Sequence, residues 1–131
     1  MSERMKRQAR KHTQPELALR KILHSRGYRY RVGLRVPGLA RRSMDIALTR
    51  VQVAVFVDGC FWHGCPIHAT WPAANADWWM AKINKNRERD LETTAHLVGL
   101  GWEVVRIWEH EPPTEAAERI VQIVLRRRSA L

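Results

Sequence analysis

Two valine-rich segments stand on either side of one long helical segment, and this arrangement restricts the fold more than any other feature of the sequence. Residues 51–57 form an almost unbroken apolar run, and residues 102–108 form a second one. Short apolar runs rich in valine are typical of buried strands. A strand, a helix and a further strand in this order predict a parallel pair joined by a right-handed crossover.

The remaining elements extend this unit into a mixed sheet flanked by helices. The predicted helices are 13–26, 75–100 and 114–128, and the predicted strands are 28–34, 44–48, 51–57 and 102–108. Residues 35–43 are expected to form a loop around Pro37 and Gly38, and residues 49–50 form a link short enough for a hairpin. The three strands before the long helix predict an antiparallel meander, so the fold class is α/β.

The chain is strongly basic. Its 131 residues include 23 Lys and Arg against 13 Asp and Glu, which gives a net charge of +10. Such a charge indicates a polyanionic partner, and nucleic acid is favoured over a membrane surface or a merely solvated surface. No apolar stretch approaches the length of a membrane span.

Residues 1–12 are predicted to form a basic N-terminal arm, and residues 13–131 a single domain. The arm lacks the apolar stretch of a secretory signal, so we expect a cytoplasmic protein. Because cytoplasmic thiols stay reduced, Cys60 and Cys65 are expected to be metal ligands or free thiols and not a disulfide.

The two cysteines lie in one segment with two histidines. Four residues separate Cys60 from Cys65, and His63 and His68 are close by. Zinc prefers four tetrahedral nitrogen or sulfur ligands, so this spacing predicts a structural zinc site. His63 and His68 compete for one ligand position, and His110, which follows the last strand, is a candidate for another.

Two aspartates are predicted to meet at one edge of the sheet. Asp45 lies near the start of one strand, and Asp58 lies at the end of the next. Acids placed in this way suit a magnesium ion that polarises a phosphate. His63 is close enough in sequence to Asp58 to take a proton from an attacking water. Glu16 has capping-box spacing with Thr13 and also serves the site if the helix start faces the acids.

Aromatic and basic side chains form a candidate DNA-binding set. Phe61 and Trp62 lie in the cysteine segment, and exposed rings in a basic protein can stack on bases or wedge between base steps. One of Trp78 and Trp79 must face outward, because adjacent helical residues point in different directions. The basic residues of the same helix form either a DNA contact or a solvated face: Lys82, Lys85 and Arg87.

Four motifs of this chain are long and specific. They read TQPELALR at 13–20, VFVDGCFWHGCP at 55–66, AKINKNRERD at 81–90 and GLGWEVVRIWE at 99–109. Together they resemble the signature of the very short patch repair (Vsr) endonuclease family. The resemblance runs from residue 4 to residue 111.

The resemblance implies a restriction-endonuclease-like core of three layers with a structural zinc site. It also implies a magnesium-dependent endonuclease that nicks one DNA strand 5′ to the T of a T:G mismatch, which arises by deamination of 5-methylcytosine. Asp45 and the backbone carbonyl of Val57 would hold magnesium, His63 would be the general base, and Glu16 would support the site. The remaining family positions correspond to a wedge of Phe61, Trp62 and Trp79, a minor-groove residue Met5, and the zinc ligands Cys60, Cys65 and His110.

The sequence departs from the family pattern at several positions. Met44 replaces a proline, Asp58 stands where some members have a histidine, and His110 stands where a cysteine is common. A histidine-rich insertion is absent, so His68 is the expected fourth zinc ligand. Asp58 is not followed by the lysine of the broader nuclease family, which leaves His63 to handle the proton and Asp58 as a metal or catalytic acid.

The expected partner is double-stranded DNA with a T:G mismatch, bound by a monomer at the nucleoid and not at a membrane. Mismatch-repair proteins are further candidate partners. Two other functions stay open: a restriction-type nuclease that acts at another DNA site, and a zinc-stapled DNA-binding module without catalysis. The joint presence of Asp45, Glu16 and His63 favours catalysis.

Overall fold

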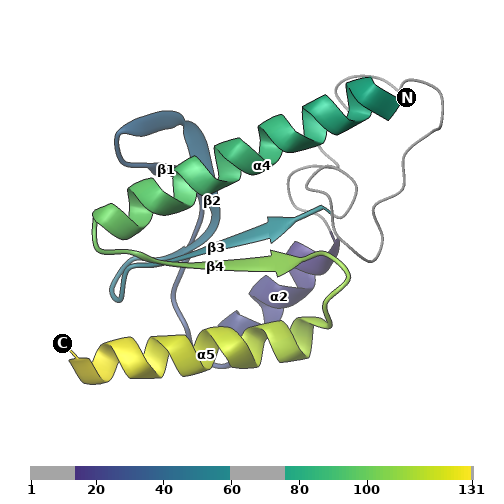
Figure 1. Cartoon of the computed structure of the whole chain (residues 1–131). Helices are drawn as coiled ribbons and strands as arrows, with labels where there is room; N and C mark the ends of the chain where they lie inside the picture. Colours follow the sequence, from purple (N-terminus) through teal and green to yellow (C-terminus); the bar gives the residue numbers. More distant parts are fainter. Residues whose placement is uncertain (1–13, 60–75, 131) are drawn as a thin grey trace.

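The computed structural model describes residues 14–59 and 76–130, and its elements follow the predicted order (Figure 1). The elements are α2 (Gln14–Ser25), β1 (Arg31–Val36), β2 (Leu39–Leu48), β3 (Val53–Asp58), α4 (Ala76–Gly99), β4 (Glu103–Trp108) and α5 (Pro113–Ala130). Among the helices described, none has the length and apolar character that crossing a membrane requires.

The four strands form one mixed sheet in the order β1-β2-β3-β4. The pairs β1–β2 and β2–β3 are antiparallel, whereas β3 and β4 are parallel and joined through α4. The parallel register runs from Val53 opposite Glu103 to Asp58 opposite Trp108. The predicted meander and the predicted parallel crossover are both confirmed.

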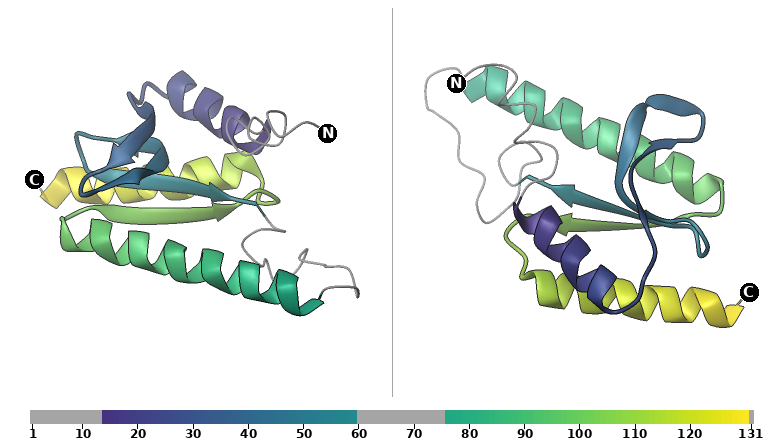
Figure 2. Two further views of the ribbon diagram at one scale, coloured as in Figure 1. Left: turned by 90° about the horizontal axis from the view of Figure 1, so that it is seen from above. Right: turned by 180° about the vertical axis from the view of Figure 1, so that it is seen from behind.

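Helices cover both faces of the sheet and make three layers (Figure 2). Val55 of β3 belongs to a buried cluster with Leu23 of α2 and Ile120 of α5. Its neighbour Phe56 points to the opposite face and packs in a second cluster with Leu97 of α4. Alternate residues of a strand face opposite sides of a sheet, so the unbroken apolar run follows from helices on both faces.

The predicted loop at residues 35–43 is wrong. Arg35 belongs to β1, and Arg41 and Arg42 belong to β2, so that only Pro37 and Gly38 form the turn. Gly38 has a φ of 85°, a left-handed conformation that glycine adopts without steric cost.

Contacts with α4 hold this hairpin in place. The ring of His96 contacts the carbonyl oxygen of Pro37, and Arg42 donates a hydrogen bond of 3.0 Å to the hydroxyl of Thr93. The arginine-rich segment is therefore ordered by tertiary contacts and by pairing in the sheet, neither of which its Pro-Gly sequence reveals.

The turn between β2 and β3 is longer than predicted. It covers residues 49–52, with Gln52 at a φ of 56°, and β3 begins only at Val53. Val51 is buried although it lies in the turn, and its apolar side chain is the reason why the strand was predicted to begin at this residue. Arg127 of α5 donates a hydrogen bond to the Val51 carbonyl and holds this turn against the helix.

Candidate active site

Asp45 lies where β2 and β3 separate. Counted from the turn at residues 49–52, the last paired residues of the two strands are Ile46 and Val55. Beyond this pair, the backbone N–H of Val57 donates a hydrogen bond of 2.8 Å to the Asp45 carboxylate. The side chain of Asp45 thus takes the place that a backbone acceptor of β2 would have if the strands stayed together.

The carbonyl of Val57 faces the same side as its N–H. The neighbouring Asp58 carbonyl accepts a hydrogen bond of 2.9 Å from the N–H of Glu109, toward β4. Successive residues of a strand direct their backbone groups to opposite neighbours. The Val57 carbonyl therefore points toward β2, the side on which Asp45 lies, and two oxygen ligands are available there.

Burial and the charges of two further acids raise the pKa of the Asp45 carboxyl. Burial raises the pKa of Asp45 to about 7, the Val57 N–H opposes this rise, and the charges of Glu16 and Asp58 add to it. Glu16 is buried in the first turn of α2, and its charge reaches Asp45, so the start of this helix lies on the side of the acids. Glu16 also pairs with Arg20, one helical turn further on.

Asp58 faces α4 and is held by an arginine. Arg106 of β4 donates hydrogen bonds of 3.1 and 3.3 Å to the two carboxylate oxygens of Asp58. The same guanidinium donates to the carbonyl of Asp90 and to the hydroxyl of Thr94, both on α4, and lies 4.3 Å from the ring centroid of Phe56. One side chain thus links β3, β4 and α4 beside the site.

The ion pairs of Arg106 with Asp58 and of Arg20 with Glu16 were not predicted from the sequence, although both arginines lie in the quoted motifs. A charged residue inside the apolar run of β4 is a signal, because such a residue needs a partner when it is buried. The i,i+4 spacing of Glu16 and Arg20 is a second signal.

The predicted DNA-binding residues of α4 lie on its N-terminal half. Trp78 is 55% exposed, whereas Trp79 is half-buried, so one ring of the pair does face outward. The two rings meet edge to face with centroids 4.6 Å apart, and the ammonium of Lys82 lies 5.1 Å from the Trp78 centroid. Lys85 and Arg87 are exposed.

Seven predicted site residues lie outside the described residues: Met5, Cys60, Phe61, Trp62, His63, Cys65 and His68. The candidate zinc ligand His110 is described and exposed, two residues after the end of β4. Within the described ranges 14–59 and 76–130, no group of three or more His, Cys, Asp or Glu is arranged to hold a metal ion.

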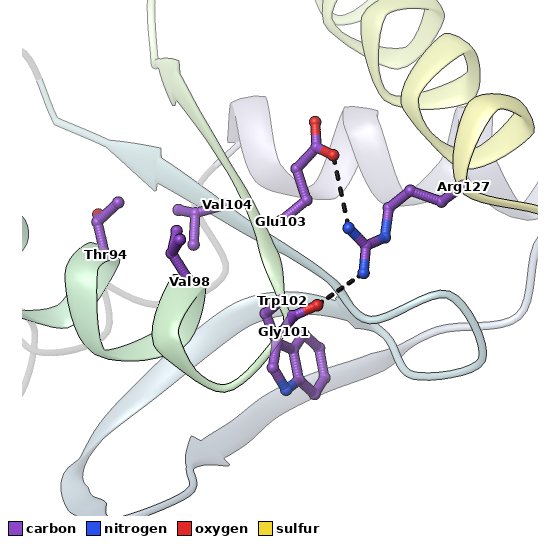
Figure 3. Close-up of a pocket in the computed structure, with 7 residues that line it drawn as sticks. All are labelled: Thr94, Val98, Gly101, Trp102, Glu103, Val104 and Arg127. Atoms are coloured by element: carbon purple, nitrogen blue, oxygen red, sulfur yellow. Dashed lines mark hydrogen bonds and ion pairs between the residues drawn. The ribbon is translucent and has the colours of Figure 1, made fainter. Parts of the chain in front are cut away.

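An open pocket lies at the other end of the parallel strands (Figure 3). It has a volume of about 420 Å³ and is lined by Thr94, Val98, Gly101, Trp102, Glu103, Val104 and Arg127. Glu103 pairs with Val53 at the start of β3, whereas Asp58 is at the end of that strand. The pocket is therefore separate from the acids around Asp45.

Comparisons with known proteins agree on one family. Residues 1–68 match the family model described as DNA mismatch endonuclease Vsr. The chain is 43% identical to the Type II nicking enzyme V.NaeI of Lentzea aerocolonigenes, over 92% of this chain and 74% of that protein. It is 41% identical to the Type II nicking enzyme V.XorIIP of Xanthomonas oryzae pv. oryzae, over 77% and 73%.

A further relative is the DNA mismatch endonuclease Vsr of Escherichia coli K12. The identity is 33%, over 82% of this chain and 68% of that protein. The family-model match over residues 1–68 includes α2, the β2–β3 hairpin and its acids. The chain belongs to the Vsr family of DNA endonucleases.

Proposed function

We propose that the chain nicks one strand of duplex DNA 5′ to the T of a T:G mismatch, by magnesium-dependent hydrolysis of a phosphodiester. The observation that carries this proposal is the placement of the Asp45 carboxylate beside the backbone of Val57, where β2 and β3 separate. An opening at this point leaves a carboxylate and a carbonyl directed to one position, in a chain whose net charge of +10 favours binding to DNA.

The residues present fit a magnesium ion. Magnesium is usually bound by one or two carboxylates, while waters and substrate phosphates complete its octahedron. The Asp45 carboxylate and the Val57 carbonyl would be the protein ligands in such an open site. When bound, the ion would polarise the scissile phosphate and neutralise charge that develops on it.

The chain's own charges favour a cation at this position. Glu16 and Asp58 raise the pKa of Asp45, which means that their negative potential reaches its carboxylate. A cation relieves this repulsion and stabilises the ionised form of Asp45. Glu16 and Asp58 would therefore act on the site through charge, and Arg106 would fix the position of Asp58.

His63 is the proposed general base. It follows Asp58 by five residues, and a neutral imidazole would accept the proton of the attacking water. The oxygen of that water would form the new bond to phosphorus while the bond from phosphorus to the 3′ oxygen of the preceding nucleotide breaks, and this leaving oxygen would take a proton from solvent water. The products would be a 3′ hydroxyl and a 5′ phosphate.

The zinc site is proposed at the neighbouring strand ends. Asp58 and Trp108 are opposite one another in the parallel register. Cys60 lies two residues after Asp58, and His110 lies two residues after Trp108. Together with Cys65 and His68 they supply the two thiolates and two imidazoles that suit structural zinc.

Selectivity for a mismatch would come from the aromatic residues. Trp79 is half-buried against Trp78, so its ring is held in one orientation. We propose that Trp79, Phe61 and Trp62 separate the base steps beside the mismatch, and that Met5 enters from the minor groove. Unstacking costs least at a mismatched pair, so such a wedge favours T:G over matched DNA.

A second candidate function is site-specific nicking of other DNA, in the manner of a restriction-type nuclease. The observation that favours it is the set of relatives named Type II nicking enzymes. The monomeric state, the mismatch-repair partners and the nucleoid location stay predictions.

The decisive experiment uses strand-labelled duplexes that are identical except for one T:G or T:A pair, in several flanking sequences. Each is incubated with the full chain and either Mg²⁺ or EDTA, and the nick is mapped. A nick 5′ to the mismatched T that requires Mg²⁺ supports the proposal. Equal nicking of the T:A duplex supports the second candidate, and binding of both duplexes without a nick would contradict both.

A further inference from the structure

The β1–β2 hairpin carries arginines that the proposed chemistry does not use. Residues 29–44 contain five arginines and no acidic residue. Arg29, Arg31 and Arg41 are exposed. The ion pairs found among the described residues involve none of these three side chains. We call these three residues the hairpin arginines.

The strand register places Arg31 diagonally from Asp45, while Arg29 lies two residues before Arg31 and Arg41 lies four residues before Asp45 on β2. Arg31 pairs with Ala47 and Arg35 with Ser43, so Gly33 between them stands opposite Asp45. Diagonal neighbours on paired strands are about 7–8 Å apart, and this is the expected separation of Arg31 and Asp45. An extended arginine side chain from this position reaches past the carboxylate.

The spacing also suits a nucleic-acid backbone. Residues two apart on an extended chain, such as Arg29 and Arg31, are separated by about 7 Å. This length spans about two nucleotides of rise along one DNA strand. The hairpin stands across α4, and no other described helix or strand lies on its outer side (Figure 2).

Charge on an edge strand has a purely structural explanation as well. β1 is at the edge of the sheet, and charged side chains there prevent edge-to-edge association. Two observations favour a ligand. All the charges are guanidinium groups, whose planar donors match phosphate oxygens, and one of them, Arg31, lies diagonally from the candidate catalytic acid in the strand register.

We propose that Arg29, Arg31 and Arg41 bind phosphates of duplex DNA on either side of the scissile one and hold the duplex against Asp45 without reading its sequence. The inference rests on the nuclease function proposed above, because it assumes that the scissile phosphate lies at Asp45. It assigns to the β1–β2 hairpin a share of DNA binding separate from the aromatic wedge and from α4.

The test compares the double variant Arg31→Gln/Arg41→Gln with the control Arg128→Gln. Arg128 is an exposed arginine in the last turn of α5, outside the β1–β2 hairpin. Binding of a matched duplex is measured by fluorescence anisotropy in EDTA, between about 50 and 200 mM KCl. The double variant should bind about tenfold more weakly at the lowest salt, and its log–log salt slope should decrease by about 0.9 for each lost phosphate contact.

The control should keep the wild-type affinity and slope within twofold. A double variant that binds like the control overturns the proposal. Arg31→Glu distinguishes phosphate binding from mere protection of the edge strand. A glutamate keeps the edge charged and soluble but repels phosphate, so only the phosphate-binding role predicts a loss of DNA affinity. Wild-type DNA affinity of a monodisperse Arg31→Glu protein would likewise overturn the proposal.

This readout is independent of the mismatch. If the wild-type chain never nicks T:G duplexes but its affinity for matched DNA depends on the hairpin arginines, the proposed specificity fails and the binding surface stands. If it nicks T:G duplexes and the double variant binds and nicks like the control, the binding surface fails and the proposed function stands.

Discussion

The N–H of Val57 donates a 2.8 Å hydrogen bond to the carboxylate of Asp45, across the point where their strands separate. An asparagine at position 45 can accept this bond but carries no charge. Asp45→Asn should therefore fold normally, bind DNA, and nick it about 10³-fold more slowly, the effect of losing about 4 kcal/mol of charge stabilisation. Single-turnover nicking with Mg²⁺ measures the rate, and anisotropy measures binding.

Glu115→Gln is the matched control, because Glu115 is an exposed acid in the first turn of α5. It should retain the wild-type rate. Undiminished cleavage by Asp45→Asn would remove Asp45 from the chemistry.

In the absence of divalent ions, stability should fall as the pH rises. The folded state holds Asp45 at a pKa of about 7, against 3.8 ordinarily, so it binds more protons than the unfolded chain between these values. The free energy of unfolding therefore decreases through this window, by up to about 4 kcal/mol. Urea denaturation in EDTA at several pH values, compared between wild type and Asp45→Asn, measures the difference. Parallel pH profiles for the two proteins would contradict the raised pKa.

Arg106 should be a major contributor to stability. Arg106→Ala removes the guanidinium that holds the Asp58 carboxylate and links β4 to α4, and should cost about 2–4 kcal/mol of unfolding free energy. Arg119→Ala, which removes a more exposed arginine paired with Glu111, should cost at most about 1 kcal/mol. Equal costs in chemical denaturation would show that the Asp58 pair is no more than a surface ion pair.

Two leucines of α4 should contribute very different amounts to the free energy of unfolding. Leu97 is fully buried against the sheet, and Leu91 is 71% exposed. Leu97→Ala should lower the free energy of unfolding by about 2–5 kcal/mol, because it leaves a cavity between α4 and Phe56. Leu91→Ala on the same helix should change it by less than about 0.5 kcal/mol. Similar losses for both would mean that α4 does not pack on the sheet through Leu97.

The zinc proposal predicts metal in the purified chain. Cys60→Ser should lose zinc and destabilise the protein, whereas His24→Gln, at an exposed histidine of α2, should keep it. His110→Gln should weaken zinc binding. Elemental analysis after dialysis gives the zinc content. A stable, active, zinc-free Cys60→Ser protein would rule out the structural site.

The order of elements could be predicted because period and apolar content are local signals, whereas the three layers were implied by the resemblance to the family. Residues 53–57 are apolar on both faces, and a helix between two parallel strands favours a right-handed crossover. The β1–β2 pairing was predicted, but its extension through residues 35–43 was missed because Arg35 and Arg41 were predicted to be loop residues. An edge strand tolerates outward arginines, and its pairing with β2 depends on contacts with α4 that lie far away in sequence.

The candidate site was predicted in part. The sequence left open whether the start of α2 faces Asp45, and the structure brings Glu16 near enough for its charge to raise the pKa of Asp45. The Asp58–Arg106 pair was not predicted, because 48 residues separate its members and only the parallel register brings them together. The roles of His63 and the cysteines stay predictions.

The turn at residues 49–52 decides which residue of β2 reaches the end of β3. Its four residues set Leu48 opposite Val53, and from this pair the count along both strands brings Asp45 opposite Phe56, one residue from the Val57 N–H that its carboxylate accepts. One residue more or less in the turn would bring Met44 or Ile46 opposite Phe56 and exchange the two faces of β2. The length of a loop at the far end of the sheet is thus as strictly constrained as the identity of the acid, and insertions there should be more damaging than most substitutions near the acid itself.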